Sequence, residues 1–291
     1  MLSGAMTAMV TPFREGKVDE SRLREQIEFQ IKGGIDGLVP VGTTGESPTL
    51  DFREHERVIA LTVEAVRGRV PVVAGTGANA TTEALELHSF AKKAGATACL
   101  SVNPYYNKPT QEGLYRHFMT LADRVDLPFV LYNIPGRTGV TMLPQTVARL
   151  RQANPRIFVA IKEATGLLDL ASEIKSLCDI TVLSGDDSLT LPLMSIGAAG
   201  VISVVSNLLP QQIKHLTKLA LDGHFTEARG IHHKLFGLTK ALFTEGNPVG
   251  IKHAMKLANL DTGELRLPLV EATEATKAQI AAQLKWLGIV K

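Results

Sequence analysis

Eight short apolar segments alternate with amphipathic segments along most of the chain, and this alternation limits the possible folds more than any other feature. The amphipathic segments repeat apolar residues at spacings of three and four, which is typical of one face of a helix. Short apolar runs that alternate with such helices indicate a parallel sheet. The expected strands span residues 5–10, 37–41, 70–74, 98–102, 129–132, 158–162, 181–183 and 200–204.

Eight strand and helix units in succession predict an α/β fold, the TIM (β/α)8 barrel. The strand pattern stops near residue 221, and the remaining sequence has a helical appendage. We therefore predict a barrel catalytic domain over residues 1–223 and a C-terminal helical domain over residues 224–291. We expect the helical part to serve packing and assembly and to offer little chemistry. Its expected helices span residues 226–243, 247–258 and 271–287.

The composition of the 291-residue chain favours a small-molecule enzyme. A net charge of +2 gives no electrostatic footprint for nucleic acid, and no block rich in Lys and Arg suggests a membrane surface. Two cysteines are too few for the disulfide framework of a secreted domain. The sequence has no signal peptide pattern at its start and no apolar run as long as a membrane span. We expect a cytoplasmic enzyme.

Lys162 is the residue that most strongly suggests chemistry, because it ends the apolar strand 158–162. Strand alternation would place its side chain on the same side as Phe158 and Ala160. A buried ammonium loses hydration, which favours the neutral amine that attacks carbonyl groups. One interpretation is therefore a Schiff-base lysine. The other is a structural lysine paired with Glu163 or another carboxylate.

Polar and small residues follow several predicted strands, at the end of the barrel where TIM-barrel active sites lie. Residues 42–46 (GTTGE) offer backbone N–H groups and two hydroxyls, which suit a carboxylate or phosphate. Residues 132–139 (YNIPGRTG) join a phenol to an arginine that could bind a carboxylate through two hydrogen bonds. The adjacent Tyr105 and Tyr106 follow the fourth strand. Residues 184–187 (SGDD) could suggest a metal, but the other strand ends offer no histidine, so we predict no metal site.

Together with Lys162, these motifs resemble the dihydrodipicolinate synthase family of pyruvate-dependent class I aldolases and lyases. The resemblance covers essentially the whole chain. The wider family also contains N-acetylneuraminate lyase, and the Thr43–Thr44 pair and Arg137 are what favour the synthase branch. The resemblance implies condensation of pyruvate with L-aspartate 4-semialdehyde to give 4-hydroxy-tetrahydrodipicolinate, in the diaminopimelate route to lysine. It implies no cofactor other than a covalent imine between pyruvate and Lys162.

The resemblance also implies roles for single residues. Lys162 would form the imine, Tyr132 would be the general acid and base, and Thr44 would pass protons between Tyr132 and Tyr106. Tyr106 would come from the neighbouring subunit of a tight dimer, within a homotetramer built as a dimer of dimers. The substrate-binding groups would be the backbone amides of Thr43 and Thr44 for the carboxylate of pyruvate, Arg137 for that of the semialdehyde, and the backbone carbonyls of Gly185 and Ile202.

A regulatory site for lysine, the product of the pathway, is a further implication of the resemblance. Family members often bind lysine at a dimer interface. Phe52 and Pro48 depart from the sensitive pattern, which has a histidine and an alanine at these positions. We therefore expect weak or absent inhibition by lysine. The residues that match the site are Ser47, His55, Asn79, Glu83 and Tyr105.

Two other functions stay open on the sequence. Another pyruvate aldolase would use the same imine with a sugar acid or 4-hydroxy-2-oxoglutarate, although Arg137 argues against a long polyhydroxylated substrate. A noncatalytic barrel with a binding or regulatory role is the alternative from a different class. The presence of Lys162 and of three hydroxyl groups for a proton relay argues against the second alternative.

Overall fold

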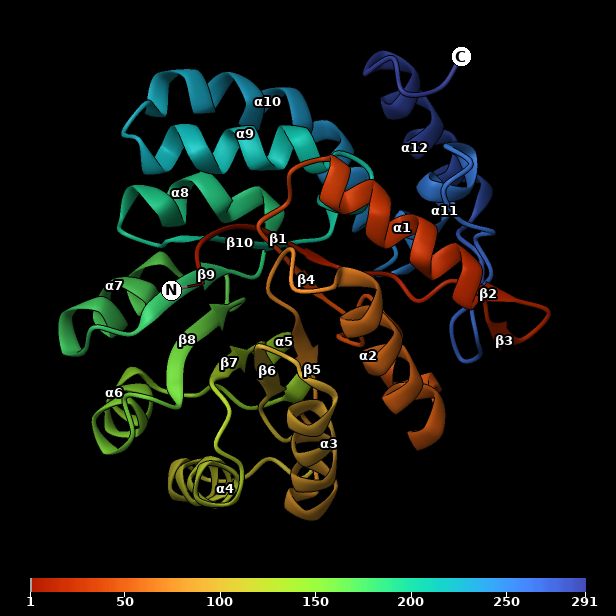
Figure 1. Cartoon of the computed structure of the whole chain (residues 1–291). Coiled ribbons are helices and arrows are strands. Elements are labelled where there is room, and N and C mark those ends of the chain that lie inside the picture. The colour runs from red at the N-terminus through yellow and green to blue at the C-terminus, as the bar shows by residue number, and fades with distance from the viewer. Residues whose placement is uncertain (1) are drawn as a thin grey trace.

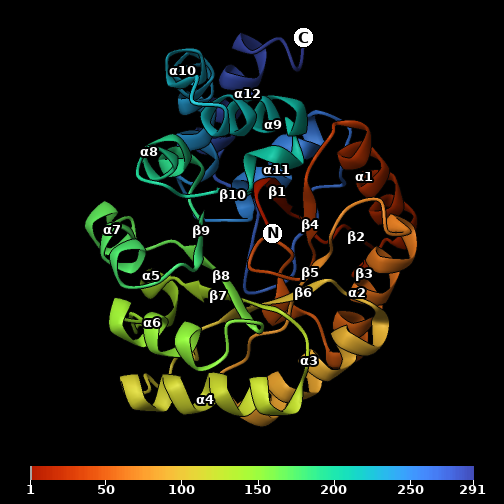
Figure 2. The same cartoon turned by 60° about the vertical axis from the view of Figure 1, so that its left-hand side comes forward.

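Eight parallel strands form the centre of the computed structural model, which describes residues 2–291 (Figures 1 and 2). These strands are β1 (Gly4–Ala8), β4 (Gly37–Val39), β5 (Val73–Gly75), β6 (Ala98–Val102), β7 (Phe129–Asn133), β8 (Phe158–Glu163), β9 (Thr181–Ser184) and β10 (Gly200–Ser203). Their order in the sheet is β4-β1-β10-β9-β8-β7-β6-β5, so strands that follow one another in the sequence are neighbours. A bridge between Leu38 and Val72 joins the two ends of the sheet. The predicted TIM barrel is confirmed.

All eight predicted strands are present, but several of their bounds differ, since β1 ends at Ala8 and β4 at Val39, two residues before the predicted ends. Strand β5 begins at Val73 rather than at residue 70. Pro71 has no N–H to donate to a neighbouring strand, and its carbonyl accepts a hydrogen bond from Leu38 N at 3.0 Å. The sequence pattern did not predict an antiparallel hairpin made of β2 (Phe13–Arg14) and β3 (Lys17–Val18), whose strands are too short to leave a periodic signal.

Strand β8 contains an irregularity that changes which side chains face the barrel interior. The register shifts after the pair Phe129 and Phe158, so Val159 is an extra residue in β8. Phe158 packs against Phe129 in the core between barrel and helices, with ring centroids 5.8 Å apart. Ala160, beyond the shift, lies in the interior cluster. The expectation that Phe158 and Lys162 share one side is therefore wrong, because the extra residue breaks the alternation.

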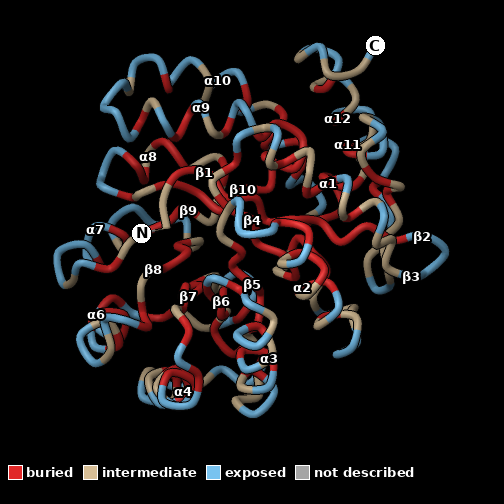
Figure 3. The backbone as a smooth tube through the Cα atoms, viewed as in Figure 1, coloured by how far each residue is buried: buried red, intermediate tan, exposed pale blue. Residues whose placement is uncertain are grey.

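Helices follow the barrel strands and cover the outside of the sheet, with their buried faces turned toward it (Figure 3). Helix α2 begins at a capping box, in which the side chains of Asp51 and Glu54 each accept from the backbone N–H of the other. Among residues 2–291, no helix combines the length and the apolar character needed to span a bilayer. The helices of the barrel region are α1 (Glu20–Lys32), α2 (Phe52–Val66), α3 (Thr81–Ala94), α4 (Gln111–Arg124), α5 (Pro135–Thr138), α6 (Pro144–Ala153), α7 (Leu168–Leu177), α8 (Thr190–Ser195) and α9 (Pro210–Leu221), with 3-10 helices η1 (Ser47–Thr49), η2 (Asp187–Leu189) and η3 (Val205–Asn207).

The three predicted C-terminal helices are present as α10 (Phe225–Leu242), α11 (Val249–Leu257) and α12 (Glu274–Trp286). Helix α10 packs against α8 and α9, and α12 packs against α10 and α11. Figure 1 shows α10 lying along α9 at the side of the barrel. The helical appendage is thus present and packed on the barrel, while its status as a separate domain from residue 224 stays a prediction.

One fully buried ion pair joins this appendage to the barrel. Lys252 of α11 pairs with Glu46, which follows β4, and both side chains are inaccessible to solvent. Lys252 also donates a hydrogen bond to the carbonyl of Glu264 at 2.7 Å, and its amine lies 4.1 Å from the ring centroid of Phe13. Burial lowers the pKa of Lys252, and the charge of Glu46 opposes that shift. The loop of residues 42–46 is therefore anchored to the C-terminal helices.

Candidate active site

Lys162 and Tyr132 lie side by side inside the barrel, near the carboxyl ends of β8 and β7. The two residues are register partners, and the Lys162 amine is 4.3 Å from the centroid of the Tyr132 ring. Lys162 is only 5% exposed. Within residues 2–291, no carboxylate forms an ion pair with it, in contrast to the buried Lys252. A lysine placed in this way, with no salt-bridge partner among residues 2–291, is available for nucleophilic attack on a carbonyl group.

The predicted alternative, a pair between Lys162 and Glu163, is wrong because strand alternation sends Glu163 to the opposite face. Its carboxylate accepts hydrogen bonds from Thr165 N at 2.7 Å and from Asn133 Nδ2 at 3.3 Å. Burial raises the pKa of Glu163, and these two donors oppose the shift. Asn133 also accepts from Met142 N at 3.0 Å and donates to Met142 O at 3.1 Å. This cluster outside the barrel fixes the ends of β7 and β8 behind the reactive pair.

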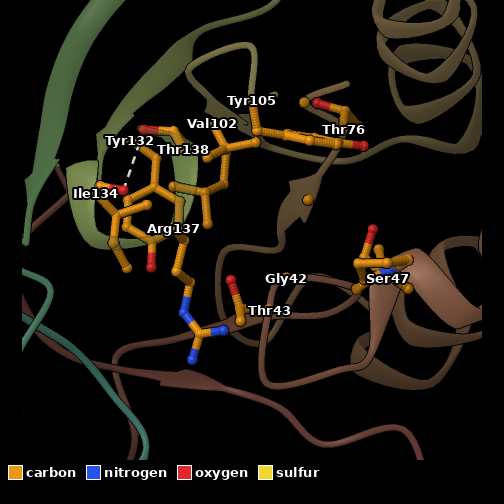
Figure 4. Close-up of a pocket in the computed structure, with 15 residues that line it drawn as sticks. Gly42, Thr43, Ser47, Thr76, Val102, Tyr105, Tyr132, Ile134, Arg137 and Thr138 are labelled. Atoms are coloured by element: carbon orange, nitrogen blue, oxygen red, sulfur yellow. Dashed lines mark hydrogen bonds between the residues drawn. The ribbon is translucent and has the colours of Figure 1, made fainter. Parts of the chain in front are cut away.

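A cavity of about 210 Å³ opens beside Tyr132 at the carboxyl ends of β4 to β7. A cavity of this size suits small metabolites rather than macromolecules. Figure 4 shows Arg137 reaching from α5 toward Thr43, with Tyr105 on the wall beside Thr76. Of the predicted catalytic and substrate-binding residues, Thr43, Tyr132 and Arg137 line this cavity. The structure thus brings together a phenol, a hydroxyl and a guanidinium.

Gly185 and Ile202, two further predicted substrate-binding residues, do not line that cavity. A Cβ atom on Gly185 would stand 3.1 Å from Cε of Lys162, so glycine leaves room for the lysine side chain. Ile202 belongs to the same interior cluster as Tyr132 and Ala160. Gly185 is therefore close to Lys162, and Ile202 faces the barrel interior, while the roles of both residues around the imine stay predictions.

Thr44 is buried, and its contact partner is a residue that sequence reasoning missed. Asn247, from the segment before α11, donates from Nδ2 to Thr44 Oγ1 at 2.8 Å. The backbone carbonyl of Asn247 accepts from Arg137 Nη2 at 3.1 Å. The only sequence signal was a polar residue inside the helix break at residues 246–248, which says nothing about contacts so distant in the chain.

Tyr106 is the predicted catalytic residue that lies apart from the others. It is 90% exposed and has a φ of +73°, in the left-handed region. It does not line the cavity that contains Tyr132. Its predicted role across a subunit interface stays a prediction.

Two of the five residues predicted to bind lysine line the cavity, and the other three do not. Ser47 and Tyr105 line the cavity near Pro48. His55 is buried, with Nε2 at 2.7 Å from Gly75 O, and burial lowers the pKa of its imidazole. The backbone carbonyl of Asn79 accepts a hydrogen bond from Asn107 Nδ2 at 2.8 Å. The side chain of Glu83 is exposed to solvent.

The fold and these contacts define a class of protein: a TIM-barrel enzyme that can form an imine between an interior lysine and a carbonyl substrate. Across residues 2–291, no cluster of three or more His, Cys, Asp or Glu side chains could hold a metal ion. The chain matches the Dihydrodipicolinate synthetase family over residues 1–287, and it belongs to that family.

Known proteins of similar sequence and structure agree with this assignment. The chain is 53% identical, over 100% of both chains, to the 4-hydroxy-tetrahydrodipicolinate synthase of Pelobacter propionicus. It is similar to the crystal structure of dihydrodipicolinate synthase from Aquifex aeolicus, with a TM-score of 0.97, 47% identity and 99% of each chain covered. A monomeric dihydrodipicolinate synthase variant has a TM-score of 0.97 at 42% identity, with 99% of this chain and 98% of that chain covered.

Proposed function

We propose that the protein condenses pyruvate with L-aspartate 4-semialdehyde to give 4-hydroxy-tetrahydrodipicolinate, a lyase reaction in the diaminopimelate route to lysine. The observation that carries this proposal is the burial of Lys162 beside Tyr132 in the barrel interior, with no carboxylate partner among residues 2–291. The full-length relative at 53% identity that carries the name of this synthase supports the choice of substrates.

The first half of the reaction builds a nucleophile from pyruvate. The Lys162 amine attacks the ketone carbon, and loss of water leaves an imine. The imine withdraws electrons, so a proton leaves the pyruvate methyl group and an enamine forms without any separate cofactor. Tyr132 moves these protons as general acid and base, and the backbone amides of Thr43 and Thr44 hold the carboxylate of pyruvate.

The second half joins the two substrates and frees the enzyme. The enamine carbon attacks the aldehyde carbon of the semialdehyde, and the new alkoxide takes a proton from the relay of Tyr132 and Thr44. The amino group of the former semialdehyde then attacks the imine carbon, which closes the ring and releases the Lys162 amine. The backbone carbonyls of Gly185 and Ile202 line the site near the imine.

The decisive test measures pyruvate consumption with L-aspartate 4-semialdehyde, coupled to the reductase that takes up the product. Cleavage of N-acetylneuraminate, run in parallel, provides the comparison. We expect turnover of pyruvate with the semialdehyde and no cleavage of N-acetylneuraminate. Turnover with N-acetylneuraminate and none with the semialdehyde would contradict the proposed substrates and assign the protein to another branch of the family.

Arg137 is expected to bind the carboxylate of the semialdehyde, so Arg137→Ala should raise the KM for this substrate. Loss of a charge-assisted hydrogen bond costs about 1.5–3 kcal/mol, which corresponds to a rise of roughly 10-fold to 150-fold. Trapping of the pyruvate imine by borohydride should stay at the wild-type level. Arg156→Ala, at an exposed arginine, is the matched control. An unchanged KM in Arg137→Ala would remove Arg137 from the substrate site.

Lysine is expected to inhibit weakly or not at all. A lysine titration of the initial rate tests this expectation, with Phe52→His as the matched variant. Phe52 is 43% exposed, so a histidine fits there without repacking of the core and restores an imidazole at that position. We expect a flat titration for the wild type and inhibition in the variant. Strong inhibition of the wild type would contradict the proposal.

The assembly proposed for the protein is a homotetramer in the cytoplasm, built as a dimer of dimers. The exposure of Tyr106, with its backbone held at a positive φ, supports a role in which its phenol enters the site of a neighbouring subunit. In that arrangement Thr44 passes protons between Tyr132 of one subunit and Tyr106 of the other. The barrel of residues 1–223 is the catalytic domain in this proposal.

A further inference from the structure

Asn247 contacts two residues of the proposed mechanism, although it belongs to the C-terminal appendage. Its side-chain amide donates to the Thr44 hydroxyl at 2.8 Å, and its backbone carbonyl accepts from Arg137 at 3.1 Å. Asn247 is 8% exposed and Thr44 is 3% exposed, so water does not compete freely for this hydrogen bond. The mechanism above gives Asn247 no role.

The direction of this hydrogen bond matters for a proton relay. A threonine hydroxyl has one proton to donate and two lone pairs that accept. The amide of Asn247 occupies one lone pair of Thr44 Oγ1. One lone pair and the hydroxyl proton remain, and a relay needs one acceptor position and one donor position. Asn247 therefore leaves Thr44 with the two capacities that proton transfer between two tyrosines requires.

The structure holds both partners of this hydrogen bond in place. Thr44 is followed by Gly45, whose carbonyl accepts from Thr11 Oγ1 at 2.7 Å. The next residue, Glu46, forms the buried pair with Lys252 of α11. Asn247 immediately precedes Pro248 and α11, so the same helix that anchors the loop also presents the amide. The Thr44 hydroxyl is thus held in place by contacts within the protein, which lowers the cost of ordering it during the reaction.

We propose that Asn247 is a positioning residue, which orients the Thr44 hydroxyl so that it can relay protons. This inference rests on the proposed function of the site, because the relay belongs to the imine mechanism. In Asn247→Ala, the side-chain amide is lost and the backbone carbonyl that contacts Arg137 stays. In Asn247→Asp, the shape of the side chain is kept, but a carboxylate can only accept a hydrogen bond. The Thr44 hydroxyl then donates its hydrogen bond to that carboxylate, and it can no longer donate within the relay.

Both substitutions should lower kcat about 10-fold to 100-fold, less than most of the roughly 100-fold to 10,000-fold that general acid and base catalysis contributes, because Thr44 keeps its hydroxyl. The KM for pyruvate should change little, because Asn247 does not line the cavity. The most direct readout uses pyruvate alone in D2O, where NMR follows exchange of the methyl protons through the imine and enamine. Methyl exchange should slow, while borohydride trapping of the imine at Lys162 should stay near the wild-type level. Thr244→Ala, an exposed position in the same segment, is the control.

A double-mutant cycle tests whether Asn247 acts through Thr44. Once Thr44→Val has removed the hydroxyl, Asn247→Ala should slow methyl exchange no further. Additive effects of the two substitutions would overturn the inference, and so would wild-type exchange and kcat in both Asn247 variants. Thermal melting of each variant separates these results from misfolding, and the isosteric Asn247→Asp remains informative if Asn247→Ala does not fold.

The methyl exchange assay also separates this inference from the proposed function. A wild-type protein that exchanges the methyl protons of pyruvate but does not consume the semialdehyde would contradict the proposed second substrate only. Slower exchange in the Asn247 variants would still support the positioning role in that case. Normal turnover of the semialdehyde by both the wild type and the Asn247 variants would leave the proposed function intact and refute the role of Asn247.

Discussion

Lys162→Ala is expected to abolish formation of the pyruvate imine and, with it, turnover of L-aspartate 4-semialdehyde. The substitution removes the amine that attacks the ketone carbon, and no other residue has been placed where it could supply that amine. Mass spectrometry after borohydride reduction in the presence of pyruvate should show the covalent adduct in the wild type and none in the variant. Full turnover by the variant would refute the imine mechanism.

The stability of Lys162→Ala provides the control for this result. Lys162 has no carboxylate partner within residues 2–291, so its removal leaves no buried charge unpaired. The variant should therefore melt close to the wild-type temperature, and its loss of activity should not reflect unfolding. A large fall in the melting temperature would indicate that Lys162 supports the fold.

Lys252→Met is expected to have the opposite effect, a large loss of stability. Removal of one partner of a buried ion pair leaves an uncompensated charge, which costs about 3–5 kcal/mol. The charge left behind is Glu46, whose side chain is inaccessible to solvent. In a chain of this size, we expect the melting temperature to fall by roughly 10 °C. Calorimetry or thermal melting by circular dichroism measures the effect.

The double variant Glu46→Gln with Lys252→Met tests the reason for this loss. It removes both charges, while the amide oxygen that replaces the carboxylate can still accept the hydrogen bond that Glu46 receives from Arg266 N at 3.2 Å. Replacement of a buried pair by neutral groups is often close to neutral in stability. We expect the double variant to recover most of the lost melting temperature. No recovery would show that Lys252 stabilises the appendage through packing rather than through its charge.

The barrel and its strand ends could be predicted from the sequence because both depend on local patterns. The apolar runs locate the strands, and the loops after β4, β7, β8 and β9 follow directly from them. Lys162 and Tyr132 were predicted separately, and the barrel brings them together because β7 and β8 are neighbours in both sequence and sheet. The placement of these two side chains next to each other could therefore be predicted from the sequence.

The features that could not be predicted depend on register or on distant contacts. The extra residue at Val159 changes the side of Phe158, and no pattern in the apolar run indicates it. The contact between Asn247 and Thr44 spans 203 positions of the chain. Thr44 was predicted from its motif, but nothing in the local sequence of Asn247 indicates a contact with it. The hairpin of β2 and β3 was missed because two-residue strands have no measurable period.

The anchoring of the 42–46 loop by α11 has a consequence for synthesis of the protein on the ribosome. All eight strands precede residue 204, so the barrel can begin to assemble while the appendage is still being translated. At that stage Glu46 has no lysine opposite it, and Thr44 has no amide to orient its hydroxyl. The nascent barrel would already contain Lys162, but the Thr44 hydroxyl would not yet be oriented for proton transfer. Folding of the last quarter of the chain onto the barrel would therefore be the final step of maturation, and incomplete chains would turn over more slowly than the full chain.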